Sequence, residues 1–170
     1  MKKKLIIILC FISFVILIFY FLDFRVIVPI SEYKYENRQL EIGDTINPLE
    51  NFDLKNGRWS AYIVLSQNDF KDIDPAITKT RCLKTTDIKL LRKMQDSWNF
   101  IYKASDIATV ESSIYIFNGK KLVFESGIIL DKNKQGLQSE SFGWIEPVNS
   151  QILIECCKEF KRVSSPIVFL

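Results

Sequence analysis

The hydrophobic pattern of the chain is dominated by one uncharged, largely apolar run close to the N-terminus. Lys2, Lys3 and Lys4 precede a segment from Leu5 to Leu22 that contains no charged residue. A helix of this length extends roughly 27 Å at about 1.5 Å per residue, close to the hydrocarbon thickness of a bilayer. The pattern therefore predicts a membrane-spanning helix over residues 5–22.

Three kinds of segment share this pattern: a cleaved signal peptide, a lipoprotein signal and an uncleaved signal anchor. A cleavable signal needs small residues before its cut, and no Ala-x-Ala-like pair follows Leu22. Cys10 could be a lipoprotein cysteine, but the bulky Leu9 precedes it and the apolar run continues well beyond it. The sequence therefore favours an anchor that remains in the mature protein and contacts the lipid bilayer through residues 5–22.

The charges on the two sides of this run predict its orientation. The three lysines lie before it, whereas Arg25 on the other side is offset by Asp23. Because cytoplasmic flanks collect Lys and Arg, residues 1–4 are expected in the cytoplasm. The chain is then a single-pass protein of a bacterial inner (cell) membrane, with the remainder on the periplasmic or extracellular side.

The charge of the remainder argues against a nucleic-acid partner. The chain has a net charge of +3, and residues 1–25 account for all of it, with four basic side chains and one acidic one. A neutral domain lacks the clustered basic face that nucleic acid requires. About 140 residues follow the anchor, a typical length for one domain.

The first exported segment, residues 23–55, has few apolar positions from Ser31 onward, so two interpretations stay open. It is either a juxtamembrane spacer or carries a first strand over Gln39–Ile42, followed by a turn at Gly43-Asp44.

Residues 56–170 show alternating and helical patterns in turn. Asn56-Gly57 marks a turn, and the aromatic and β-branched residues of Trp59–Leu65 predict a central strand. Asp87 is expected to cap a helix whose buried positions recur at helical spacing: Ile88, Leu91, Met94 and Trp98. The opposite face of that helix is expected to be solvated and carries Lys89, Arg92, Lys93 and Asp96.

The clearest strand signal is a hairpin over Ser112–Phe117 and Lys121–Leu130, with Asn118-Gly119 at its turn. Trp98–Lys103 is expected to pair beside this hairpin. A second helix should follow Asn149 and end near Arg162, and residues 166–170 should form a terminal strand. Clustered strands without regular βαβ alternation predict an α+β domain with a mainly antiparallel sheet and about two helices.

The chain contains no histidine, which removes the usual base of Ser-His-Asp and Cys-His sites and the commonest neutral metal ligand. Its scattered glycines form no phosphate-binding loop. No catalytic, cofactor-binding or metal-binding residue is therefore assigned, and no cofactor is expected. Eight carboxylates remain as candidates for a two-acid enzyme, but no spacing singles out a pair: Asp69, Asp72, Asp74, Glu111, Glu125, Asp131, Glu140 and Glu146.

Three cysteines outside the anchor would face an oxidising compartment. Cys82 is expected to form a disulfide with either Cys156 or Cys157, because adjacent cysteines in a helix diverge too far to bridge each other. Buried free thiols are the alternative.

Four aromatic residues, Trp59, Trp98, Phe142 and Trp144, suit a recognition surface, although core packing explains them more simply. The sequence thus favours a non-enzymatic, membrane-anchored domain that binds a protein, as an immunity-type or envelope accessory protein would. The alternatives are an enzyme that acts on envelope polysaccharide through paired carboxylates, and a carrier of small ligands.

Overall fold

A computed structural model describes residues 2–23, 25–30, 33, 39–104 and 110–170 of the chain. The helices are α1 (Lys2–Phe21), α2 (Ile88–Ser97), α3 (Ser150–Lys158) and a short 3₁₀ helix, η1 (Asn68–Lys71). The strands are β1 (Val26–Val28), β2 (Thr45–Ile46), β3 (Trp59–Val64), β4 (Cys82–Thr85), β5 (Phe100–Tyr102), β6 (Ser113–Asn118), β7 (Lys121–Leu130), β8 (Gln135–Ser139), β9 (Gly143–Pro147), β10 (Lys161–Arg162) and β11 (Ile167–Phe169).

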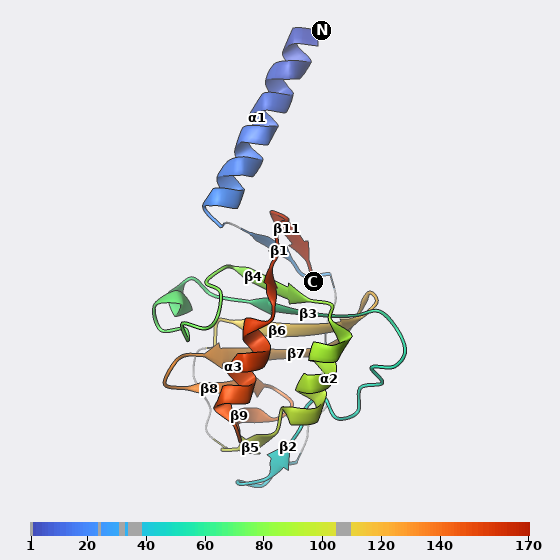
Figure 1. Cartoon of the computed structure of the whole chain (residues 1–170), viewed down its shortest axis with the longest axis vertical. Coiled ribbons are helices and arrows are strands. Elements are labelled where there is room, and N and C mark those ends of the chain that lie inside the picture. The colour runs from blue at the N-terminus through green and yellow to red at the C-terminus, as the bar shows by residue number, and fades with distance from the viewer. Residues whose placement is uncertain (1, 24, 31–32, 34–38, 105–109) are drawn as a thin grey trace.

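Nine of these strands form one antiparallel sheet in the order β10-β4-β3-β6-β7-β8-β9-β5-β2 (Figure 1). The chain runs through β6, β7, β8 and β9 as a meander, while β10 returns from α3 to the edge beside β4. The predicted fold class, an α+β domain with a mainly antiparallel sheet and two helices after the first, is confirmed.

Both α2 and α3 cover the same face of this sheet (Figure 1). Strand β3 shows why: Trp59, Ala61 and Ile63 are buried, and the residues between them are only partly so. Side chains alternate between the two faces of a strand, so these three point to the helices and join Leu91 and Met94 in the main core. The predicted strand over Trp59–Leu65 and the predicted helix from Ile88 are confirmed.

Part of the other face of the sheet is covered by the segment that follows α1 and by residues 167–170. Strands β1 and β11 pair in parallel as a two-stranded mini-sheet, in the register Val26–Ile167, Ile27–Val168 and Val28–Phe169. Val168 packs there with Cys82 in a second, smaller cluster that also holds Phe117, Leu122 and Leu170. The predicted strand near the end of the chain is confirmed, and β1 is the partner that the sequence did not indicate.

The hairpin differs from its prediction by one residue at the turn. Asn118 still belongs to β6 and pairs with Lys121, so the two-residue loop is Gly119-Lys120. Gly119 has a φ of 64°, which suits the first central position of a type II′ turn, where glycine is preferred. The prediction of Asn118-Gly119 as the central pair was therefore wrong, although the two arms are confirmed.

Strand β5 and the end of helix α3 differ from their predictions because of long-range pairing, and a local turn excludes one of the two interpretations of residues 23–55. Strand β5 lies between β9 and β2, not beside the hairpin. Gln39–Ile42 forms no strand, because Asp44 accepts a hydrogen bond from the amide of Glu41 and closes a turn before β2. Helix α3 begins as predicted after Asn149, whose side chain accepts from the amide of Ile152, but it ends at Lys158 so that β10 can pair with β4.

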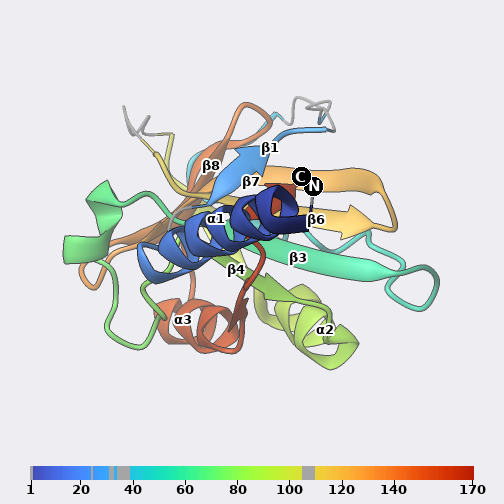
Figure 2. The same cartoon turned by 90° about the horizontal axis from the view of Figure 1, so that it is seen from above.

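Helix α1 is uncharged and largely apolar from Leu5 onward, and it projects away from the domain (Figures 1 and 2). Its window Lys4–Phe21 has a mean hydropathy of 2.8 and none of it is buried. Such a helix is long and apolar enough to cross a membrane, as a membrane anchor or as a signal sequence.

A polar junction joins the end of α1 to the domain, and Asp23 is its centre. The Asp23 carboxylate forms ion pairs with Arg25 (3.3 Å) and Arg162 (3.0 Å). It also accepts hydrogen bonds from the Thr80 hydroxyl and the Arg81 amide. Arg25 donates to the carbonyl of Phe19 and Arg162 to that of Tyr20, so two cations satisfy carbonyls at the C-terminal end of α1.

Candidate functional site

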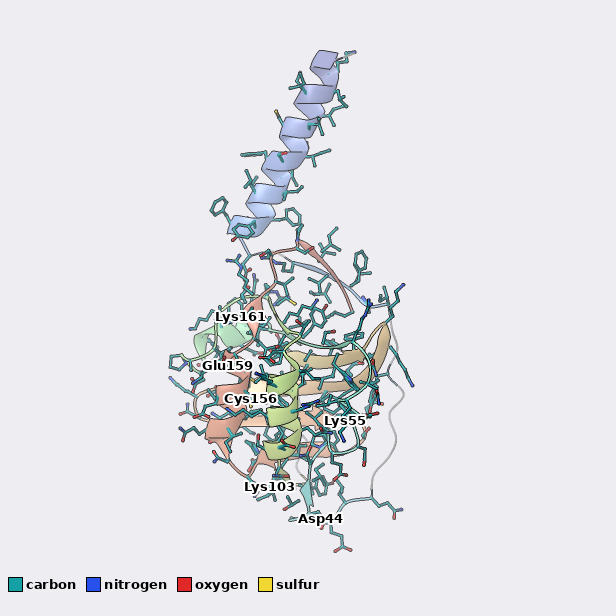
Figure 3. All side chains as sticks on the ribbon, turned by 45° about the vertical axis from the view of Figure 1, so that its right-hand side comes forward. Asp44, Lys55, Lys103, Cys156, Glu159 and Lys161 are labelled. Atoms are coloured by element: carbon teal, nitrogen blue, oxygen red, sulfur yellow. The ribbon has the colours of Figure 1, made fainter. Side chains whose placement is uncertain are left out.

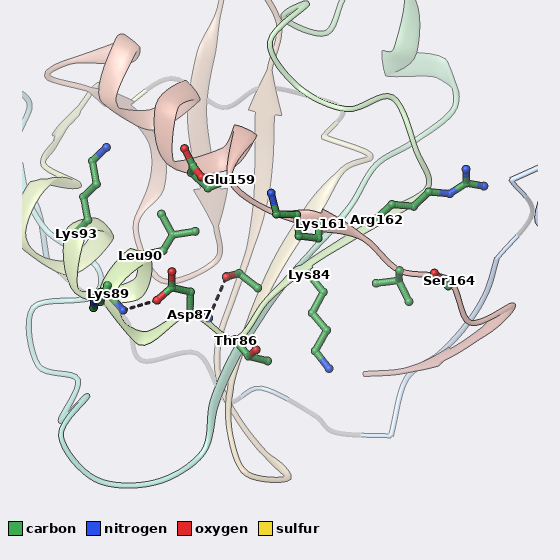
Figure 4. A pocket seen from close by; sticks show the side chains of 12 residues that line it. Lys84, Thr86, Asp87, Lys89, Leu90, Lys93, Glu159, Lys161, Arg162 and Ser164 are labelled. Atoms are coloured by element: carbon green, nitrogen blue, oxygen red, sulfur yellow. Dashed lines mark hydrogen bonds between the residues drawn. The ribbon is translucent and has the colours of Figure 1, made fainter.

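An open groove of about 770 Å³ lies where β4, α2, α3 and β10 meet (Figure 4). The side chains of this basic groove come from two stretches of chain, residues 84–93 and 159–164. They are Lys84, Thr85, Thr86, Asp87, Lys89, Leu90, Lys93, Glu159, Lys161, Arg162, Val163 and Ser164.

Local signals in the sequence build the two walls of the basic groove. Asp87 caps α2, since its carboxylate accepts from the amide of Lys89 at 2.8 Å. The helix then places Lys89 and Lys93 one turn apart on its exposed side. At the opposite wall, α3 ends at Lys158, and the chain turns to bring the exposed Lys161 to the edge of the sheet.

Positive charge predominates in the groove, with five basic side chains against the carboxylates of Asp87 and Glu159. Three of the five are engaged: Lys93 with Glu155 at 3.6 Å, Arg162 with Asp23, and Lys84 over the ring of Tyr62. Lys89 and Lys161 form no ion pair with any residue that the structure describes. These two exposed ammonium groups are thus available to an anionic ligand.

The chemistry of the groove favours binding over catalysis. One of its carboxylates, Asp87, is occupied in capping α2, and the other, Glu159, lies on the opposite wall.

The groove lies in the half of the domain that is nearer to α1. In Figure 3, Glu159 and Lys161 lie toward the α1 end of the domain, whereas Lys103 and Asp44 lie at the far end. Because Arg162 also contacts Tyr20, the groove opens beside the end of α1.

A second, smaller cavity of about 100 Å³ brings together four of the eight candidate carboxylates: Asp69, Asp72, Glu111 and Asp131. Ser112 donates to Asp69, while Ser66 and Asn68 both donate to Glu111. Those hydrogen bonds lower the pKa of Glu111, because they stabilise its charged form. A glycosidase acid needs the opposite shift, so Glu111 does not suit that role.

Another candidate, Glu125, does show a raised pKa, and a second candidate, Glu140, lies close enough to contribute to it. Partial burial raises the pKa of Glu125, and the nearby charge of Glu140 raises it further. Neither residue lines the basic groove or the carboxylate cavity. Of the remaining candidates, Asp74 caps a turn through the amide of Ala76, and Glu146 pairs with Lys103.

Within the described residues, no three cysteines or carboxylates are arranged to hold a metal ion. The cysteines themselves are free thiols. Cys82 lies in the second cluster, whereas Cys156 and Cys157 belong to the main core on the helix side of the sheet. The sheet separates them, so the disulfide from Cys82 is not formed in this structure. Burial raises the pKa of Cys82 to about 12 and that of Cys157 well above its ordinary value.

The four aromatic candidates are core residues. Trp59, Trp98, Phe142 and Trp144 are all buried. The Trp144 indole donates to Glu146 at 3.1 Å and lies over Gly136, where a Cβ would be only 2.2 Å from the ring. The structure therefore presents no recognition surface made of these four side chains.

Reasoning from the sequence missed the basic groove, although part of its signal was present. The spacing of Lys89 and Lys93 predicted that both are exposed, and Lys161-Arg162 is a visible basic pair. Their proximity depends on the packing of α2 against α3 and on the return of β10 to the sheet edge, which the residue pattern does not encode. No family model, curated protein or solved structure matches the chain.

Proposed function

We propose that the chain is a single-pass protein of a bacterial inner membrane, and that its domain binds an acidic segment of a partner protein in the basic groove. The N-terminus is cytoplasmic and the domain lies outside. Five basic side chains around an open groove of about 770 Å³ carry the proposal. Electrostatic complementarity of this kind selects a partner and speeds its association.

The junction supports an anchor rather than a cleaved signal. Peptidases require an accessible, extended chain at the cut, but Asp23 and Arg25 are tied to the domain by ion pairs and hydrogen bonds. The Arg25 side chain is fully buried, and β1 begins at the next residue. Removing α1 would also remove the carbonyls to which Arg25 and Arg162 donate.

Protein is the occupant that fits the groove best. The groove lies beside β10, the terminal strand of the large sheet, where a partner segment can run alongside exposed backbone. The mixture of Leu90, Val163 and threonines with the lysines suits an acidic peptide that also carries apolar side chains. An immunity-type protector and an envelope accessory subunit would both bind in this way.

Charge reversal in the full-length protein tests the proposal. The double variant Lys89→Glu/Lys161→Glu should lose about tenfold or more in affinity for the partner, because it opposes like charges in the groove. A matched control, Lys55→Glu/Lys132→Glu, changes the net charge equally at two exposed lysines that do not line the groove.

The measurement is cross-linking from residue 164, an exposed groove position that none of these variants changes, in intact cells, followed by quantitative identification of the captured proteins. One partner that is captured by the wild type and the control pair, and lost from the groove pair, would support the proposal. Equal capture by all three proteins would rule out the groove as its binding site. Polysaccharide hydrolysis by the purified protein, lost in Glu125→Gln, would favour the enzymatic alternative.

A further inference from the structure

The outer face of the mini-sheet is apolar and exposed. In the register of β1 and β11, Val26 lies opposite Ile167 and Val28 opposite Phe169, so these four side chains share one face. Val26, Ile167 and Phe169 are 39%, 47% and 59% exposed, whereas Val168 on the inner face is 5% exposed. A contiguous exposed apolar patch of this kind marks an interaction surface.

This outer face continues the apolar surface of α1. Phe21 and Leu22 at the end of the helix are 79% and 69% exposed, and Ile30 just after β1 is 63% exposed. Figure 1 places the two strands between α1 and the large sheet, and Figure 2 looks onto the domain from the α1 side, where β1 lies. The junction at Asp23 fixes α1 to the same end of the domain.

We propose that the outer face of the mini-sheet is a second membrane contact, which lies in the interfacial layer of the bilayer that α1 spans. The inference rests on the anchor of the proposed function. A bilayer that surrounds Phe21 and Leu22 is only a few residues away from Val26, so the lipid that covers the helix end also covers this face. Apolar side chains at that depth are stabilised by transfer out of water.

The second contact gives the domain a defined position on the membrane. A helix alone leaves the domain free to tilt and rotate, whereas a helix and an apolar sheet face together fix the angle. The basic groove beside Arg162 is then held close to the lipid surface, within reach of a partner that is itself membrane-bound.

Fluorescence quenching by brominated lipid tests this inference in the full-length protein reconstituted into phosphatidylcholine vesicles. A tryptophan is introduced at Phe169 and, in a second variant, at Ile167. Tyr20→Trp reports the end of α1, and Val148→Trp reports an exposed apolar position that follows β9 and is 57% exposed. The native tryptophans are buried and contribute equally to every variant.

Brominated lipid should reduce the emission of Phe169→Trp and Ile167→Trp to an extent comparable with Tyr20→Trp, and leave that of Val148→Trp unchanged. Quenching of Tyr20→Trp alone would overturn the second contact but leave the anchor intact. Loss of quenching in Tyr20→Trp as well would overturn the anchor itself. Failure of partner capture affects neither result.

Discussion

The two faces of the nine-stranded sheet are covered in different ways. On one face, α2 and α3 supply regularly spaced apolar side chains, and the main core includes Phe100, Met94 and Leu153. On the other face, β1 and β11 come from segments about 140 residues apart and meet over a small cluster around Cys82 and Val168. The first face is stabilised by apolar burial against the two helices, whereas the second depends on long-range strand pairing and on the charged junction at Asp23.

The largest expected effect comes from cutting into the main core. Phe100 is completely buried and lies edge-on to Trp98, with 6.0 Å between the ring centroids. Phe100→Ala should lower the free energy of unfolding by about 3–5 kcal/mol, through lost burial and the cavity left behind. Urea unfolding followed by tryptophan fluorescence measures this change. Phe169→Ala, on the exposed face of the mini-sheet, is the control and should cost less than about 0.5 kcal/mol; equal losses would contradict the assignment of the core.

Breaking the junction should loosen the mini-sheet and leave the main core folded. Asp23 has a φ of 51°, a conformation that asparagine tolerates, so Asp23→Asn removes the charge without straining the backbone. The loss of two ion pairs should favour local opening by about 2 kcal/mol. Hydrogen exchange should become faster at the amides of β1 and β11 but not at those of α2. Asp96→Asn on the exposed side of α2 should change neither; global unfolding by Asp23→Asn would refute a local role.

The thiols give a smaller and more diagnostic effect. Cys82→Ala should cost about 1 kcal/mol, as expected for one buried side-chain group rather than a disulfide. Because Cys82 and Cys156 lie in separate clusters, the losses of Cys82→Ala and Cys156→Ala should add in the double variant. The losses of Cys82→Ala and Cys157→Ala should add in their double variant in the same way. A double variant no less stable than a single one would instead reveal a bridge.

The smallest effect concerns the carboxyl of Glu125 on β7. Its pKa is raised in the folded protein, so the folded state binds a proton more readily and the wild type loses stability as the pH rises through that value. Glu125→Gln should therefore unfold at a higher temperature than the wild type at pH 7, and the difference should vanish near roughly pH 3. Thermal scans at several pH values measure it. Glu140→Gln should give a smaller gain because burial is the larger cause; a gain independent of pH would exclude the titration.

What the sequence predicted follows the same division between the two faces. The helical spacing of the apolar residues Ile88, Leu91 and Met94 and the cap at Asp87 are local signals, and they correctly located α2. Alternation did the same for β3 and for both arms of the hairpin. Strands β8 and β9 were not predicted. Gln135–Ser139 is mostly polar, and it forms a strand because Leu137 and Trp144 are buried in the folded domain.

The candidate site was less predictable than the fold. Lys89 and Lys161 are 72 positions apart in the chain, and nothing local indicates that β10 joins the sheet beside α2. The expected disulfide rested on the number of cysteines outside the anchor, because nothing local in the sequence indicates which cysteines come together in the fold. In the structure Cys82 and Cys156 belong to separate clusters on opposite faces of the sheet.

Arg162 belongs to the wall of the basic groove and also to the ion pair with Asp23 that holds α1. A single guanidinium that serves two partners links their equilibria thermodynamically. If α1 spans a membrane and the groove binds a ligand as we propose, a ligand that draws Arg162 away from Asp23 loosens the helix, and a change in the angle of the helix alters the affinity of the groove. Through this one side chain, the orientation of the helix would then be coupled to the occupancy of the groove.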